Sequence, residues 1–168
     1  GQEKALIDFQ LMAESGNLIT PESLKGHWTF MFFGYTLCPD ICPLTLQVMK
    51  QTLEQLQAEV DSGQVRGLFV SVDPERDTPE KLAQYTGYFH PAIDGATGEK
   101  DQIDALTRSL GIIYNKVENA KDPENYLVDH SAAILLINPQ AEFAAVLSPP
   151  HEASIMAADF RALKARTE

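Results

Sequence analysis

The sequence contains only two cysteines among its 168 residues, and this scarcity limits the roles open to them. A small disulfide-stabilised scaffold needs several bridges, so that class of protein is excluded. Cys38 and Cys42 are four residues apart, and a bridge closing so short a loop would stabilise the chain by only about 2 kcal/mol. We therefore expect the pair to serve chemistry rather than to staple the fold.

The sequence also lacks a long apolar run and a cluster of basic residues. No segment approaches the roughly 18–20 apolar residues of a membrane-spanning helix. The formal net charge of −11, without any Lys/Arg cluster, argues against a nucleic-acid partner. The chain begins at Gly1 instead of Met, and we interpret this as removal of a signal or membrane anchor. Its length and its 44% hydrophobic content predict one domain, residues 1–168, with a proper core.

Apolar periodicity predicts the main elements of that domain. Residues 27–34 and 65–73 contain continuously apolar runs, which are typical of strands covered on both faces. Apolar residues at helical spacing, followed by turn or loop residues, predict helices. The predicted helices are 44–60, 79–89 (capped by Thr78), 101–110 and 152–165.

The remaining segments predict short strands and loops. Alternating residues around the turn at 15–17 predict a hairpin within 5–26, ending in a short helical turn at 20–23. The other predictions are a loop at 95–98, a short strand at 111–115, an exposed loop at 119–125, and an antiparallel hairpin of 132–137 and 142–147. Strand-helix-strand units followed by an antiparallel pair and a closing helix predict a three-layer α/β sandwich. A cysteine pair after the first core strand makes this a thioredoxin-like plan with an N-terminal β-hairpin extension.

The two cysteines lie at the junction between the first core strand and the following helix. Pro39 suits the first helical position, which would put Cys38 at the N-cap beside unsatisfied N–H groups. That position favours the thiolate and lowers its pKa, and thiolate is both the nucleophile and the metal ligand. Three residues separate the cysteines, and this spacing alone leaves both electron transfer and metal binding open.

A histidine is the natural partner for two thiolates, and the sequence offers four candidates. His27 is expected at the surface, His90 at a helix end and His151 at a helix start. His130 differs because it precedes a strong apolar strand, where thioredoxin-like folds place a loop facing the cysteines. We therefore expect His130 to face Cys38 and Cys42.

Three motifs together resemble those of the Sco/SenC family. They are Gly34-Tyr35-Thr36 with Cys38-Pro39-Asp40-Ile41-Cys42-Pro43, then the segment from Ser71 to Pro79, then Asp129-His130-Ser131. The resemblance extends over essentially the whole chain. It implies a thioredoxin-fold copper protein, usually anchored by one N-terminal helix, that helps assemble the binuclear copper centre in subunit II of cytochrome c oxidase. Carried over, the copper ligands are Cys38, Cys42 and His130.

The resemblance also implies a set of copper ligands, a cellular location for the protein and a donor of copper. Cu(I) prefers thiolate and accepts imidazole, so two sulfurs and one nitrogen suit it. We expect the periplasmic side of a bacterial inner membrane, with the mitochondrial inner membrane as the alternative, and a periplasmic copper donor. The chain departs from the family pattern at residues 95–98 and at Gln140-Ala141, both away from the predicted site.

Three carboxylates are candidates for a supporting role. Asp129 adjoins His130, but neighbours on a strand point to opposite faces, so it could orient the loop or the imidazole instead of binding copper. Asp73 and Asp77 follow a core strand, on the side where strand ends gather. Turn and helix-cap chemistry is the competing interpretation for both.

Two other functions use the same residues. A thiol-disulfide oxidoreductase would reduce partner cysteines with Cys38 and Cys42 and would not deliver copper; this is the enzyme activity we consider. A peroxiredoxin-like enzyme usually shows Pro-x-x-x-Thr-x-x-Cys, which residues 34–38 do not match. In the copper hypothesis, the reduced pair and neutral His130 capture the metal, affinity falls at low pH, and oxidation to a disulfide abolishes binding.

Overall fold

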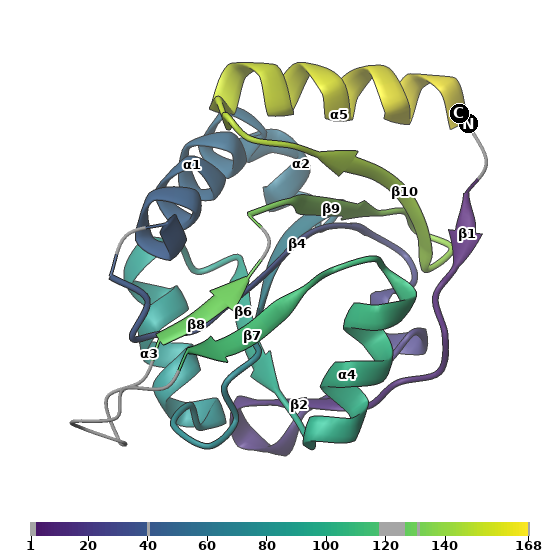
Figure 1. The fold of residues 1–168 in the computed structure, drawn as a ribbon. Helices are drawn as coiled ribbons and strands as arrows, with labels where there is room; N and C mark the ends of the chain where they lie inside the picture. The colour runs from purple at the N-terminus through teal and green to yellow at the C-terminus, as the bar shows by residue number, and fades with distance from the viewer. Residues whose placement is uncertain (1–2, 40, 118–126, 131, 168) are drawn as a thin grey trace.

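An eight-stranded sheet forms the centre of the protein in this computed structural model (Figure 1). The structure describes residues 3–39, 41–117, 127–130 and 132–167. The strand order is β1-β10-β9-β4-β5-β6-β2-β3, and β7 pairs with β8 in a separate two-stranded sheet. The strands are β1 (Lys4–Ala5), β2 (Leu11–Ala13), β3 (Leu18–Ile19), β4 (Trp28–Gly34), β5 (Val65–Ser71), β6 (Ile93–Thr97), β7 (Tyr114–Val117), β8 (Leu127–His130), β9 (Ile134–Ile137) and β10 (Glu142–Leu147).

The helices cover the sheet in the layers expected for an α/β sandwich. They are α1 (Ile41–Gln55), α2 (Gln57–Asp61), α3 (Pro79–Phe89), α4 (Lys100–Ser109) and α5 (Ala153–Thr167). In Figure 1, α1 and α3 lie on the left and α5 across the top, while α4 lies at the lower right beside β7. The parallel pair β4-β5 is joined through α1 and α2, and the parallel pair β5-β6 through α3. The predicted three-layer α/β arrangement is confirmed.

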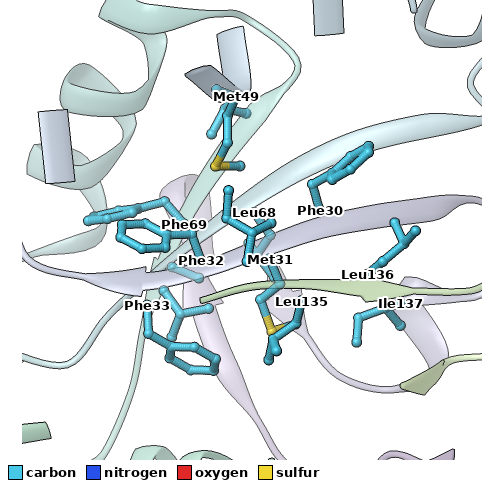
Figure 2. Packing of buried hydrophobic residues seen from close by; sticks show 14 of the residues in the cluster. Phe30, Met31, Phe32, Phe33, Met49, Leu68, Phe69, Leu135, Leu136 and Ile137 are labelled. Atoms are coloured by element: carbon cyan, nitrogen blue, oxygen red, sulfur yellow. The ribbon is translucent and has the colours of Figure 1, made fainter. Parts of the chain in front are cut away.

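Strand β4 is the core of the sheet because all seven of its residues are buried. Successive side chains point to opposite faces, as Figure 2 shows for Phe30 and Phe32 on one side and Met31 and Phe33 on the other. The ring of Phe30 lies 5.9 Å from that of Phe160 on α5. One face of β4 therefore packs against helices, and that same face carries Gly34 at its end.

Most of the predicted elements are present, and the N-terminal segment contributes more than its hairpin. Leu11 of β2 pairs with Ile19 of β3, so the predicted hairpin is confirmed, and it extends one edge of the sheet through β6. Strand β1 joins the opposite edge beside β10, which the sequence pattern did not indicate. Thr78 caps α3 as predicted, accepting a hydrogen bond from the Lys81 N–H.

The predicted loop at 95–98 is wrong, because its first three residues belong to β6, a strand in the interior of the sheet. Gly95 pairs with Phe69 and packs against α3, where a Cβ would lie 2.8 Å from the Leu82 Cβ. Glycine serves here for the close approach of a helix to a strand instead of a turn. The predicted helix 44–60 is also divided, into α1 and α2, at Leu56.

The hairpin between β9 and β10 retains the geometry of a glycine turn without a glycine. Ala141 has a φ of 59°, in the left-handed region that favours glycine. The buried Asn138 side chain compensates by accepting hydrogen bonds from the N–H groups of Gln140 and Glu142. The antiparallel pairing predicted for this hairpin is confirmed.

Candidate metal centre

The two cysteines follow directly from the end of β4, but the helix begins later than predicted. The Cys38 N–H donates to the Tyr35 carbonyl at 3.3 Å, which closes a turn before the helix. Helix α1 starts at Ile41, so Cys42 is its second residue and Cys38 lies outside it. The expected N-cap position of Cys38 is therefore wrong. Pro43 was the better signal, because a proline in the first helical turn lacks only an N–H that the helix does not use.

The two sulfurs are not joined in a disulfide. Cys42 is completely buried, whereas 8% of Cys38 is exposed. The hydrogen bond with Cys38 and the burial of the side chain raise the pKa of the Cys42 thiol, against an opposing contribution from the Tyr35 backbone. The pair is thus a dithiol whose members contact each other, and both residues are buried, Cys38 slightly less than Cys42.

Gly34 makes room for the buried sulfur. A Cβ at this position would lie 2.6 Å from the Cys42 Sγ and 2.8 Å from a ring carbon of Phe69. Both distances are shorter than real carbon contacts, so any side chain at residue 34 would displace the thiol or the ring. The last residue of β4 must be glycine for Cys42 to occupy this position.

We expect Gly34→Ala to lower the free energy of unfolding by about 1–3 kcal/mol, the usual effect of overpacking a core. Gly87→Ala is the matched control, since a Cβ there meets nothing within 4 Å on helix α3. That substitution should stabilise the protein by roughly 0.5–1 kcal/mol. Urea unfolding of the reduced proteins measures both. Equal stability of Gly34→Ala and the unsubstituted protein would contradict the proposed crowding around Cys42.

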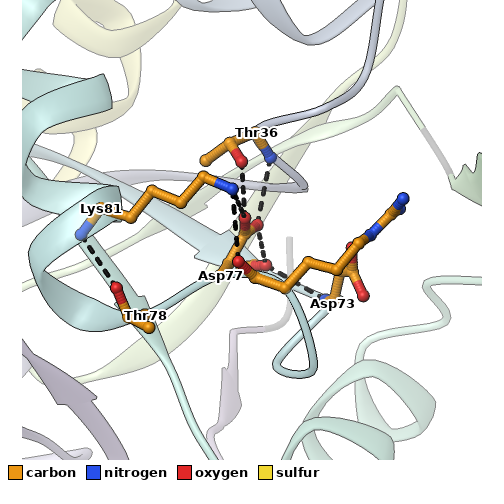
Figure 3. A network of polar contacts seen from close by, with 7 residues as sticks. Thr36, Asp73, Asp77, Thr78 and Lys81 are labelled. Carbon is orange, nitrogen blue, oxygen red and sulfur yellow. Dashed lines mark hydrogen bonds and ion pairs between the residues drawn. The ribbon is translucent and has the colours of Figure 1, made fainter. Parts of the chain in front are cut away.

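A buried carboxylate fastens the cysteine-bearing loop to the sheet (Figure 3). Asp77 accepts hydrogen bonds from the Thr36 N–H at 3.1 Å and the Thr36 hydroxyl at 2.5 Å. The carboxylate oxygen that accepts from the Thr36 N–H also accepts from the hydroxyl of Ser71 at 2.6 Å, and Ser71 is the last residue of β5. Lys81 on α3 contributes an ion pair at 3.8 Å. Asp77 therefore joins the loop before Cys38, the end of a core strand and the next helix.

Asp73 stabilises the loop between β5 and α3 and, through Arg76, contacts the segment before Cys38. Its carboxylate accepts from the Arg76 Nε at 2.5 Å, and the Arg76 guanidinium lies 5.7 Å from the centroid of the Tyr35 ring. Its carbonyl closes the turn by accepting from the N–H groups of Arg76 and Asp77. Turn chemistry is thus correct for Asp73, while the helix cap belongs to Thr78 and not to Asp77.

His130 ends a short strand, where the sequence interpretation placed a loop. Strand β8 pairs antiparallel with β7, with His130 opposite Tyr114 and Asp129 opposite Asn115. The side-chain positions of Asp129 and His130, and residue 131, lie outside what the structure describes. Among the side chains that it does describe, no three His, Cys, Asp or Glu groups converge to hold a metal ion.

The sheet register brings the chain after His130 to the end of β4. Ile134 of β9 pairs with Phe32, two residues before Gly34. Residues 132 and 133 therefore lie near the end of the sheet at which β4 stops and the chain continues toward the cysteines. The fold places the backbone of the third candidate ligand at the same end of the sheet as the sulfur pair.

The other three histidines lie in the fold as follows from their burial and hydrogen bonds. His27, expected at the surface, is half-buried, and burial lowers its pKa. His90 ends α3 as expected, and its Nδ1 accepts a hydrogen bond from the Ala92 N–H at 2.9 Å. His151 precedes α5 and contacts the Ala132 carbonyl, a bond that no sequence pattern indicated.

The rim of the site is more apolar than predicted. Leu44, which the helical pattern assigned to the buried stripe, is 60% exposed. It lies one turn from Ile41, and Leu37 precedes Cys38; both are also exposed. The pattern failed here because Cys42, Thr45 and Leu46 form the buried face of this part of α1, and Leu44 lies on the opposite face.

Comparison with known proteins identifies the family. A sequence model of the SCO1/SenC family matches residues 1–165. The chain belongs to the SCO1/SenC family. It is 40% identical to the human mitochondrial SCO2 homolog over 136 residues, which are 81% of this chain and 51% of that protein. The chain thus spans about half the length of that curated relative.

Solved SCO1/SenC structures resemble this one closely. The structure of Arabidopsis thaliana ScoI with copper bound has a TM-score of 0.86 and 33% identity, covering 95% of this chain and 98% of that one. The structure of Bradyrhizobium japonicum ScoI with copper bound has a TM-score of 0.84 and 34% identity, covering 95% and 99%. The predicted thioredoxin-like fold is therefore confirmed.

Proposed function

We propose that this protein binds copper through Cys38, Cys42 and His130 and delivers it during assembly of the binuclear copper centre in subunit II of cytochrome c oxidase. The observation that carries the proposal is the contacting pair of reduced cysteines at the end of β4. Family membership supports it, since the ScoI relatives from Arabidopsis thaliana and Bradyrhizobium japonicum are described with copper bound.

The chemistry of this donor set suits Cu(I). Two thiolates and one imidazole provide soft ligands for a three-coordinate ion. Copper must displace the thiol protons, so affinity is expected to rise with pH. Cys38 is the less buried of the two cysteines, so an acceptor thiol could replace it first, while the enclosed Cys42 releases the ion last. Asp73 and Asp77 would support the site by holding the loop that carries Cys38, and Asp129 by orienting the segment of His130.

The partner would be another protein that offers cysteine ligands. The exposed apolar side chains of Leu37, Ile41 and Leu44 lie next to the two cysteines in the sequence and suit a protein surface. We place the protein on the periplasmic side of a bacterial inner membrane, held by an N-terminal anchor, where a periplasmic donor would supply copper. Within the described part of the chain, no helix has the length and apolar character to cross a membrane.

A thiol-disulfide oxidoreductase is the second candidate, and the unequal burial of the two sulfurs favours it. Cys38, the less buried of the two, could attack a partner disulfide, after which the enclosed Cys42 would resolve the mixed disulfide. A disulfide switch is described for BsSco, a more distant relative. At 22% identity that likeness shows the fold alone, so the switch is proposed here from the two sulfurs themselves.

Replacing His130 separates the two functions. We expect His130→Ala to weaken copper binding by the reduced protein by more than about tenfold while leaving thiol-disulfide exchange in place. His27→Ala, at the opposite end of β4, is the control and should change neither. Competition with a copper chelator and a thiol-exchange assay give the two readouts. Undiminished copper affinity together with collapsed exchange would instead make the protein a reductase.

A further inference from the structure

His151 makes a contact that links the segment before α5 to the segment after His130. The Nε2 of His151 lies 2.7 Å from the Ala132 carbonyl oxygen. A carbonyl can only accept, so Nε2 carries the proton and donates it. The other ring nitrogen, Nδ1, is buried and has no hydrogen-bond partner in the described part of the chain. The single polar contact described for this imidazole is therefore the bond to Ala132.

The register of the sheet shows why this bond matters. Leu147 of β10 and Phe32 of β4 both pair with Ile134, the first residue of β9. The chain therefore enters β9 through residues 132–133 and leaves β10 through residues 148–151 at the same end of the sheet. Strand β4 also ends there. The bond from His151 to Ala132 joins these two segments. Ala132 is two residues from the proposed ligand His130.

His151 lies two residues before α5, and that helix is firmly packed. On α5, the Met156 sulfur contacts the Thr52 hydroxyl of α1, and the Phe160 ring lies 5.5 Å from Trp28 at right angles. Residues with little freedom of their own are those that can fix a neighbouring segment. The imidazole therefore donates from the start of a packed helix to the segment that leads into β9.

We propose that His151 is a positioning residue for copper binding: its bond to the Ala132 carbonyl fixes the backbone beyond β8 and thereby holds His130 in place. The proposal rests on the proposed function, because it takes His130 as a ligand. His151 acts through the chain and not as a third ligand, since it does not converge with the two cysteines among the described side chains.

Two substitutions at residue 151 test the bond. His151→Phe keeps a ring but removes the donor, whereas His151→Gln can place an amide N–H where Nε2 lies. In the metal-free protein, we expect faster amide hydrogen exchange across residues 132–134 for His151→Phe and unchanged exchange for His151→Gln. Unchanged exchange in His151→Phe would overturn the anchoring role whether or not copper binds.

A double-mutant cycle with His130→Ala then tests the link to copper. We expect His151→Phe to lower the copper affinity of the reduced protein about tenfold, the lower end of the loss seen for residues behind metal ligands, and His151→Gln to restore it. In the His130→Ala background, His151→Phe should cause no further loss. An equal loss in both backgrounds would show a general structural effect and overturn the positioning role.

The same cycle distinguishes failure of this inference from failure of the proposed function. If His130→Ala binds copper as well as the unsubstituted protein, His130 is not a ligand, and both the proposed ligand set and the positioning role fail. If His130→Ala weakens binding but His151→Phe does not, only the role of His151 fails.

Discussion

Oxidation of Cys38 and Cys42 to a disulfide is expected to lower copper affinity by more than about a hundredfold, because even losses behind the ligands cost about ten- to a hundredfold. The disulfide removes both thiolates at once, leaving imidazole as the remaining proposed ligand. The contact between the two side chains makes the oxidation local, without rearrangement of the sheet. Copper titration before and after mild oxidation, with thiol counting to verify the state, measures the effect.

Serine substitutions provide the control for this redox prediction. Cys38→Ser and Cys42→Ser each leave one sulfur and cannot form the internal disulfide, so oxidant should not change their already weakened copper affinity through that bond. Reduction should restore full binding to the oxidised, unsubstituted protein. If that oxidised protein binds copper as tightly as the reduced one, the sulfurs are not the ligands and the proposed switch does not exist.

Replacing Asp77 is expected to cause the largest loss of stability of any single polar substitution near the site. Asp77→Ala should lower the free energy of unfolding by about 3–5 kcal/mol, as when one member of a buried charged group is removed. The substitution leaves the Thr36 N–H, the Thr36 hydroxyl and the Ser71 hydroxyl without the acceptor they share. Urea unfolding of the reduced, metal-free protein measures the loss.

Asp77→Asn is the matched variant, because it keeps the shape but replaces one acceptor oxygen with a donor. Combined with Thr36→Val in a double-mutant cycle, it should show a coupling of about 0.5–3 kcal/mol. Glu80→Ala, at an exposed residue in the first turn of α3, should change stability by less than about 0.5 kcal/mol. A loss below about 1 kcal/mol for Asp77→Ala would mean that this carboxylate does not hold the loop.

The sequence predicts those parts of the fold where apolar periodicity is continuous. Strands β4 and β5 and helices α3 and α5 agree with their predictions because burial alone specifies them. Errors occur where tertiary packing determines a residue's role and the residue type alone does not indicate that packing. Gly95 suggested a loop, but it is glycine because α3 packs against β6 at that point. Leu44 suggested a buried stripe, but it lies on the exposed face of α1.

The candidate site shows the same division. The cysteine pair was visible in the sequence because its residue types and spacing carry chemistry of their own. The bonds that hold its surroundings join distant segments: Asp77 to Thr36 across 41 residues and His151 to Ala132 across 19. Aspartate before a helix reads as a cap, and histidine after two prolines reads as a helix start. Neither pattern could indicate a partner that only the sheet register brings close.

The most direct test of the copper site is X-ray absorption spectroscopy of the reduced protein loaded with one equivalent of Cu(I). The proposed ligands predict two sulfur neighbours and one imidazole nitrogen per copper, with the imidazole contribution lost in His130→Ala. A copper ion bound by sulfur alone, or an identical spectrum for His130→Ala, would contradict a site formed by Cys38, Cys42 and His130.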